Sequence, residues 1–415
     1  MTQTSAPGRL IWALGATQII GYGTLYYAFS ILAPDMAREF SVPVEQIFGL
    51  LSLALLIGAF FAPKAGGWAD RYGAGRLMAP GSLAAGLALA LAAMAPNILV
   101  LGSALVAMQI ASIFVLYSTA FAALVQVGGA MARRSITHLT LIAGFASTLF
   151  WPLTAALHDH LSWRSLYLIF AALNILVCLP IHLWVRRLPP ARTAEPLAPG
   201  VLAEGPPIAP PASADAGRTI FLIMLFAFCI EGFVLASILV HMVPMITALG
   251  LGTAGLMVST LFGPSQVASR LLNMMFGGRL SQLMLAVISA GLLVSALCVL
   301  LLSGSWIPGV IVFAVLFGLG SGLASIVGGT LPLELFGKKG YGARLGWVTA
   351  SRQFSTAAAP FAFALMMQSW GLDLALTAGI LAAALAVAAF TGIAVLKGRS
   401  VRPRSPSSGP AEYEA

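Results

Sequence analysis

The sequence predicts an all-α membrane protein of twelve transmembrane helices in two bundles of six, and three observations support this. The 415 residues are 59% hydrophobic and only 8% charged, with a mean hydropathy of +0.95, whereas about 25% of the residues of a soluble protein are charged. The apolar residues fall in twelve runs of roughly the 20 residues that cross about 30 Å of hydrocarbon. One polar, proline-rich stretch separates the first six runs from the last six.

The apolar runs set the expected domain organisation. They cover residues 10–34, 46–63, 77–95, 98–124, 136–157 and 163–185, and then 219–247, 253–276, 283–304, 307–335, 345–369 and 372–396. We therefore expect an N-terminal bundle over residues 1–185 and a C-terminal bundle over residues 219–396. Residues 186–218 cannot bury a core and are expected to form a flexible cytoplasmic linker. Residues 397–415 are expected to form a disordered cytoplasmic tail.

The distribution of positive charge predicts the orientation. With a cytoplasmic N-terminus, only Arg38 and Arg164 of the 22 Lys and Arg residues face the opposite side. Arg270 and Arg352 fall within the membrane, and the other 18 face the cytoplasm. Cytoplasmic loops carry an excess of Lys and Arg, so we expect a multi-pass protein of a bacterial inner membrane with both termini in the cytoplasm. The net charge of +9 then requires no nucleic-acid partner.

Several function classes are not expected. Cys178, Cys229 and Cys298 lie in apolar runs without metal-ligand spacing, which excludes a disulfide or zinc framework. His158 and His160 share a short outer loop without a third ligand. The sequence contains no nucleotide-binding loop, zinc-protease motif or nucleophile elbow. We expect no metal, no cofactor and no enzymatic activity, and a chain that functions as a monomer in the bilayer.

Two arginines lie inside predicted helices, where a charged side chain is costly and therefore indicates a functional site. Each shares a helix face with neutral polar residues at intervals of three and four. These are Gln266, Ser269 and Asn273 around Arg270, and Thr349, Gln353 and Thr356 around Arg352. The planar guanidinium binds carboxylates and phosphates and stays charged when buried. We predict an anion site; the alternative is that each arginine pairs with an acid or with helix-end carbonyls.

Glu231 is the one acid deep within a predicted helix, so it cannot neutralise both arginines. It is the candidate proton carrier; the alternative is that it contacts backbone or linker water without a role in transport. His241, near the outer end of the same helix, is a second candidate for titration or gating, or a hydrogen-bonded interfacial histidine. Protons are therefore the expected coupling ion.

Polar residues of the first half are expected to line the cavity opposite the arginines. Gln18, Tyr22 and Tyr26 lie at intervals of four on the first predicted helix, and Gln109 lies on the fourth. Tyrosines near a helix end also anchor helices at the membrane interface. Tyr22 is therefore the stronger candidate, and the neighbouring Tyr27 is the weaker one.

The loop between the second and third predicted helices reads GGWADRYGAGRLM and resembles the signature of the major facilitator superfamily, G-x-L-A-D-R-x-G-R-[RK]. The matching residues are Gly66, Asp70, Arg71, Gly73 and Arg76, while Trp68 replaces the Leu and Ala74 and Gly75 depart from the basic pair. The resemblance implies two six-helix halves that rock about a midplane site, with the Asp and Arg forming a latch at the cytoplasmic end. The corresponding loop of the second half, FGGRLSQ, lacks the Asp, so a second latch is not expected there.

The polar helices also resemble those of monocarboxylate transporters and bacterial oxalate/formate antiporters. Arg270 matches their substrate-binding Arg on the eighth helix, and Arg352 takes the place of the antiporter's Lys on the eleventh. Gln266 stands where monocarboxylate transporters have an Asp. The resemblance implies a secondary transporter for a small organic anion, such as a monocarboxylate, coupled to protons. The alternatives are efflux of an anionic xenobiotic or metalloid conjugate and, from another class, a non-transporting membrane receptor.

Overall fold

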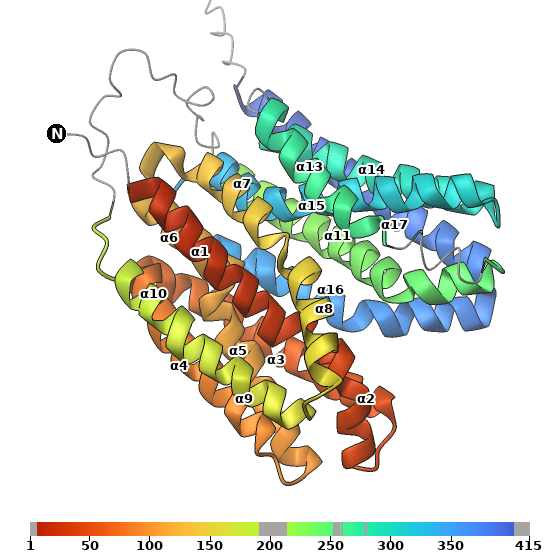
Figure 1. The fold of residues 1–415 in the computed structure, drawn as a ribbon. Helices are drawn as coiled ribbons and strands as arrows, with labels where there is room; N and C mark the ends of the chain where they lie inside the picture. The colour runs from red at the N-terminus through yellow and green to blue at the C-terminus, as the bar shows by residue number, and fades with distance from the viewer. Residues whose placement is uncertain (1–5, 191–213, 252–257, 259, 278–279, 402–415) are drawn as a thin grey trace, which may run out of the picture.

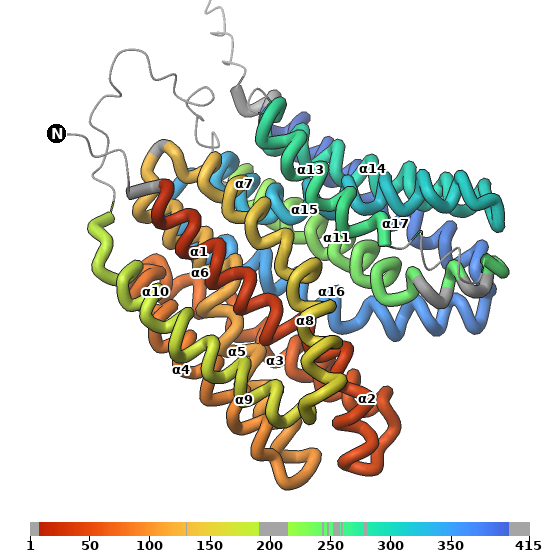
Figure 2. The backbone as a smooth tube through the Cα atoms, in the orientation of Figure 1, coloured from red at the N-terminus to blue at the C-terminus, as the bar shows by residue number. Residues whose placement is uncertain are grey.

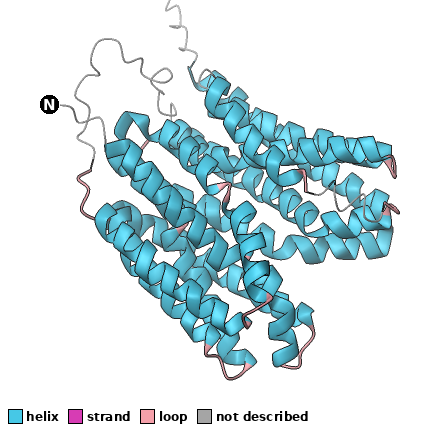
Figure 3. Cartoon of the chain, in the orientation of Figure 1, coloured by secondary structure: helices cyan, strands magenta, loops and turns pink. Residues whose placement is uncertain are grey.

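The computed structural model describes residues 6–190, 214–251, 258, 260–277 and 280–401, and every regular element within these ranges is a helix (Figure 3). Most of the expected linker and of the expected tail lies outside the described residues. Helix α11 begins at Ala214, inside the stretch assigned to the linker, and α17 continues to Val401, inside the stretch assigned to the tail.

The N-terminal half contains the helices of the first six predicted spans, several of them interrupted. Its α-helices are α1 (Ala6–Tyr22), α2 (Phe29–Glu39), α3 (Val44–Tyr72), α4 (Ala74–Ala93), α5 (Ile98–Val115), α6 (Tyr117–Gly128), α7 (Ala132–Ala143), α8 (Ala146–His158), α9 (Trp163–Leu173) and α10 (Leu179–Val185). Two π-helical turns, η1 (Gly23–Tyr27) and η3 (Asn174–Cys178), join α1 to α2 and α9 to α10, and the 3₁₀ turn η2 (Gly129–Met131) precedes α7. Such π turns occur frequently at functional sites.

The C-terminal half has longer, less interrupted helices. They are α11 (Ala214–Ala248), α13 (Phe262–Phe276), α14 (Gln282–Ser303), α15 (Ile307–Phe336), α16 (Tyr341–Trp370) and α17 (Leu372–Val401). Within the described part of the chain, nine helical stretches are long and apolar enough to cross a membrane. Neither α13 nor α16 is among them, and these two helices carry Arg270 and Arg352.

The two halves meet near one end of the molecule and diverge toward the other. In Figures 1 and 2 they lie together near α7 and α15 and separate toward α2 and the far ends of α11 and α14. The end where they meet carries Arg71, Arg133 and Arg344, and we call it the basic end. One buried apolar cluster crosses between the halves there, because Tyr341 and Leu345 of α16 pack with residues of α1, α4 and α6.

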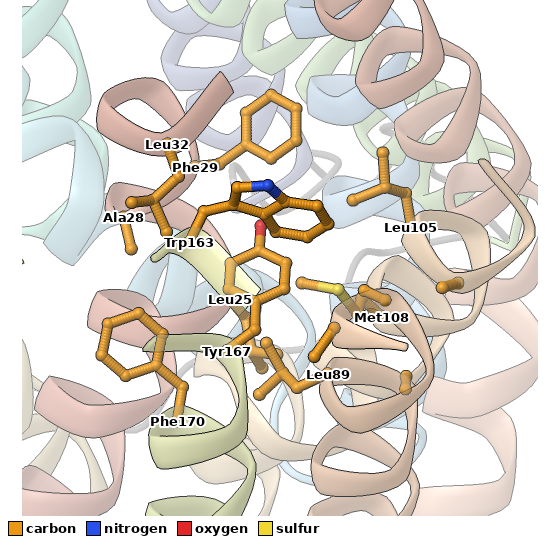
Figure 4. Close-up of a cluster of buried hydrophobic side chains, with 14 of the residues drawn as sticks. Leu25, Ala28, Phe29, Leu32, Leu89, Leu105, Met108, Trp163, Tyr167 and Phe170 are labelled. Atoms are coloured by element: carbon orange, nitrogen blue, oxygen red, sulfur yellow. The ribbon is translucent and has the colours of Figure 1, made fainter. Parts of the chain in front are cut away.

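The N-terminal half has a core of its own on the side of the opposite end. Leu25, Leu32 and Met108 pack there with aromatic side chains of α9, including Trp163 and Tyr167 (Figure 4). At its margin, Glu39 accepts hydrogen bonds from Trp163 Nε1 at 2.6 Å and Arg164 Nε at 2.8 Å. The bond from Arg164 lowers the pKa of the Glu39 carboxyl. Arg164 also donates to the carbonyls of Ala93 and Ala95 at the end of α4, so this cluster ties α2, α4 and α9 into one rigid unit.

Candidate functional site

A cavity of about 380 Å³ lies between the halves and receives side chains from both. This volume is within the range of small-molecule sites, about 300–1,000 Å³. Of the residues predicted to bind substrate, seven line the cavity: Tyr22, Tyr26, Gln109, Gln266, Arg270, Arg352 and Gln353. The weaker candidate Tyr27 lines it as well.

Arg270 is buried in α13 and connects the two halves. Its Nε donates a hydrogen bond to Ser325 Oγ of α15 at 3.1 Å, within its own half. Its Nη1 donates to the Thr140 carbonyl of α7, in the other half, at 3.2 Å. The guanidinium occupies the space beside Gly144, where an added Cβ would collide with Nη1. Both partners are neutral, so the charge of Arg270 is not neutralised by these contacts.

Arg352 of α16 approaches the same turn of α15 from another direction. Its Nη1 donates to the Ala324 carbonyl at 3.5 Å, and a Cβ added at Gly328 would lie 2.8 Å from this nitrogen. Ala324 and Ser325 are adjacent, so the two guanidiniums converge on one turn of α15. No ion pair of the described residues involves either arginine. Of the alternatives for the arginines, contacts with carbonyls are therefore present and pairing with an acid within the described residues is not.

Neutral polar groups and aromatic rings surround the guanidiniums. Gln266 Nε2 donates to Ser321 Oγ at 2.9 Å, which fixes this side chain against α15. Arg352 interacts electrostatically with Tyr22, and Arg270 interacts in the same way with Tyr27 and Tyr117. The cavity therefore has cationic groups on the C-terminal half and tyrosines on the N-terminal half.

Two of the predicted substrate residues do not line the cavity. Gln18 is fully buried, and its amide donates to the Val115 carbonyl at 2.7 Å, which joins α1 to α5. Asn273 lies one turn further along α13 than Arg270, packed against Gly277. Helical spacing placed both residues on the correct face, but the face is longer than the cavity. The structure gives their predicted role no support.

Glu231 lies behind the cavity wall. The residue is 1% exposed. A Cβ added at the neighbouring Gly232 would lie 3.5 Å from the Cα of Arg352. Ser289 Oγ lies 2.9 Å from Glu231 Oε1 and 3.0 Å from the Gly320 carbonyl. Glu231 is also within electrostatic range of Arg352. The second candidate, His241, bonds through Nδ1 to the Ser237 carbonyl at 2.9 Å and does not line the cavity.

The loop that resembles the superfamily signature, residues 66–78, contacts the other half at the basic end. The two carboxylate oxygens of Asp70 accept hydrogen bonds from the backbone N–H groups of Gly342 and Ala343, both at 2.8 Å. These are the first turn of α16, where a carboxylate is stabilised by unpaired N–H groups and the helix dipole. Gly66 lies against the Gly342 carbonyl with no space for a Cβ. Asp70 thus holds the two halves together by capping a helix of the other half.

The remaining residues of this loop shape it. Gly73 has φ +94°, a conformation that favours glycine. Arg71 stacks over Tyr72 at 5.3 Å, and no ion pair between Asp70 and Arg71 or Arg76 is present among the described residues. The expected Asp–Arg latch is therefore, in this conformation, a contact of Asp70 with backbone N–H groups.

The side chains of two residues at the basic end make contacts that the sequence did not predict. Gln126 of α6 accepts a hydrogen bond from Ala74 N and donates to the Ala69 carbonyl, both at 2.8 Å, and so braces the loop that carries Asp70. Arg133 of α7 donates to the Leu280 carbonyl of the other half at 2.5 Å. The loop of the second half is therefore engaged across the interface although it lacks the Asp. An isolated glutamine or loop arginine gives no sequence signal for such contacts.

We expect Gly144→Ala to weaken anion binding at the arginines of the cavity without unfolding the protein. The added methyl group would take the position of Arg270 Nη1, so the flexible guanidinium would leave the Thr140 carbonyl and change its direction in the cavity. The half-saturation concentration for an anion that binds these arginines should rise about tenfold, the equivalent of roughly 1.4 kcal/mol. Gly263→Ala on α13 is the matched control, because its added Cβ meets no atom within 4 Å. Equal half-saturation of the two variants would show that the position of Arg270 is not critical.

Two helical bundles that enclose a cavity between them, with contacts between the bundles concentrated at one end, are the architecture of a secondary transporter. The sequence profile of the Major Facilitator Superfamily matches residues 14–285. The chain belongs to this superfamily, and it is a multi-pass membrane protein with twelve helices in two bundles. The expected fold is confirmed.

Solved structures agree with this assignment. The human organic anion transporter MFSD10 (TETRAN) superimposes with a TM-score of 0.69 at 16% identity, over 93% of this chain and 100% of that one. The proton:xylose symporter XylE, bound to 6-bromo-6-deoxy-D-glucose, gives 0.66 at 11% identity over 92% and 95%. FucP in the outward conformation gives 0.65 at 14% identity over 94% and 98%. These identities establish the fold alone, and no curated protein matches the chain in sequence.

Proposed function

We propose that this protein is a secondary transporter that moves a small organic anion, such as a monocarboxylate, across the cytoplasmic membrane by alternating access. The observation that carries the proposal is the convergence of Arg270 and Arg352 on one turn of α15, at the cavity and without an acidic partner among the described residues. Each guanidinium has five N–H donors, and a carboxylate can accept two of them from one arginine. The similar fold of an organic anion transporter agrees with this proposal.

We place the basic end in the cytoplasm, because Lys and Arg accumulate on that side of membrane proteins. The contacts of Asp70 with α16 and of Arg133 with Leu280 then close the cytoplasmic side. The halves diverge toward the other side (Figure 1), so the conformation is outward-facing. An anion entering from outside would reach Arg270 before the cytoplasmic contacts open.

Counting hydrogen atoms supports a protonated Glu231 in this conformation. The single hydroxyl hydrogen of Ser289 can be donated to Glu231 or to the Gly320 carbonyl, but not to both acceptors at once. Both contacts are satisfied if Glu231 carries a proton and donates it to Ser289 Oγ, which then donates to Gly320. Because Arg352 is near, the carboxyl and the substrate anion respond to the same positive charge. We infer that Glu231 is the proton carrier.

Uptake into proteoliposomes tests this function. We expect labelled lactate, pyruvate, formate or oxalate to accumulate, with at least one acid stimulated several-fold by an inward proton gradient. Glu231→Gln should abolish the stimulation, because the amide keeps the size and hydrogen bonds of the protonated acid but cannot release a proton. Asp373→Asn, an exposed acid at the first turn of α17, is the control and should retain it. Uptake of none of these acids by the wild type would contradict the proposal and favour export of a larger anion.

A further inference from the structure

The cavity wall contributed by the N-terminal half carries a group of aromatic rings. Tyr22, Tyr27, Tyr117 and Phe121 all line the cavity, and all come from the N-terminal half. Their rings form a continuous series. Tyr22 and Tyr117 have centroids 4.8 Å apart, Tyr117 and Phe121 are stacked at 4.8 Å with an interplanar angle of 14°, and Tyr22 and Tyr27 are 6.3 Å apart.

A hydrogen bond between η1 and η3 supports this series of rings. Tyr22 immediately precedes the π turn η1 and Tyr27 is its last residue. Thr24 within η1 accepts a hydrogen bond from Asn174 of η3 at 3.0 Å. Tyr22, Tyr27 and Tyr117 are nevertheless only partly buried. Their ring faces are therefore positioned by the fold and accessible from the cavity.

The rings and the guanidiniums line the same cavity, and no cation–π contact joins them among the described residues. The cation–π contacts of the described residues involve Arg71, Arg164 and Arg344, but neither cavity arginine. Arg352 and Arg270 still lie within electrostatic range of the tyrosines opposite. An occupant of the space between them would contact a cationic wall on one side and an aromatic wall on the other.

A small aliphatic acid can interact with only one of these two walls. Formate or lactate bound to the arginines would leave the tyrosine faces in contact with water. A planar ring attached to the carboxylate can reach both walls, since aromatic rings associate favourably at centroid distances of 4.5–7 Å in offset or tilted arrangements. No acidic residue lines the cavity among those described, so nothing there favours a cationic or zwitterionic substrate.

We propose that the substrate is an aryl carboxylate, whose carboxylate binds Arg270 and Arg352 and whose ring packs on Tyr22 and Tyr117. This inference rests on the proposed anion transport and specifies its substrate class. The ring then contacts the N-terminal half while the carboxylate contacts the C-terminal half, so one substrate molecule connects the two bodies that rock against each other.

Equilibrium binding to the purified full-length protein in detergent tests the proposal, and it avoids the passive diffusion of protonated acids through a bilayer. Labelled benzoate is the probe, with unlabelled benzoate, cyclohexanecarboxylate and lactate as competitors. We expect benzoate to compete at concentrations about tenfold or more below the other two. Tyr117→Leu should remove this preference by weakening benzoate and leaving lactate unchanged. Phe361→Leu, an exposed aromatic on the helix of Arg352 that does not line the cavity, should behave as the wild type.

The outcomes separate the substrate class from the transport function. Equal competition by cyclohexanecarboxylate or lactate, or an aromatic preference that survives in both Tyr117→Leu and Tyr22→Leu, would overturn the aryl assignment and leave the anion site intact. Binding of none of the acids, or wild-type binding of benzoate by Arg270→Gln, would instead overturn the anion site itself. Thermal unfolding of each variant identifies any that fail to fold. If one of the two tyrosine variants fails to fold, the other one tests the aryl assignment.

Discussion

We expect replacement of either Arg270 or Arg352 with Gln to lower the uptake of the proposed anionic substrate at least about 100-fold while the protein still folds. A hydrogen bond to a charged group contributes about 1.5–3 kcal/mol, and a carboxylate desolvated in the cavity without its cation loses more than one such bond. A loss of about 2.7 kcal/mol already corresponds to 100-fold. Initial uptake rates over a range of substrate concentrations measure the effect, together with thermal unfolding of each variant.

The two positions should respond differently to lysine. Arg270 uses Nε for Ser325 and Nη1 for the Thr140 carbonyl, a geometry that the single ammonium of lysine cannot reproduce. Arg352 makes one long contact, with the Ala324 carbonyl, so Arg352→Lys should retain more uptake than Arg270→Lys. Arg134→Gln, an exposed arginine of α7, controls for the loss of one positive charge. Wild-type uptake by either Gln variant would remove that arginine from the site.

The sequence was sufficient to predict the fold and to locate the two arginines, because a charge within an apolar run of 20 residues has few explanations. It also predicted the tyrosines of the first helix through their spacing. The position of the cavity along each helix could not be predicted, since a polar face extends over several turns and only packing decides which turn is open. Gln18 and Asn273 lie on such faces and outside the cavity.

The hydrogen-bond partners of the predicted residues could not be predicted from the sequence either. Ser325 and the Ala324 carbonyl accept hydrogen bonds from Arg270 and Arg352 because α13 and α16 both pack near one turn of α15. This proximity is a property of the tertiary structure. Tyr117 and Phe121 gave no signal, since aromatic residues are common in membrane helices. The loop motif did predict a contact at the basic end, but the N–H donors that bind Asp70, in the first turn of α16, lie about 270 residues further along the chain.

Gly66→Ala should shift the protein away from the conformation described here. The backbones of α3 and α16 approach each other so closely that a Cβ on Gly66 would overlap the Gly342 carbonyl oxygen and lie 3.2 Å from the Cα of Ala343. Backbone atoms within two packed helices cannot move aside as a side chain can. The added methyl group therefore acts at the interface between the halves, and each half keeps its own core.

The size of this shift follows from the cost of overpacking, about 1–3 kcal/mol, which changes a two-state population ratio by about 5- to 150-fold. Only the conformation closed at the basic end bears this cost, because the contact is lost when the halves separate there. Spin labels at Arg134 and Lys339, exposed residues of opposite halves at the basic end, should report a larger fraction of long distances. Gly67→Ala is the adjacent control, since its Cβ meets no atom within 4 Å. If both variants give the wild-type distance distribution, the close approach of α3 and α16 does not determine the conformational equilibrium, and the contact of Asp70 with α16 must do so instead.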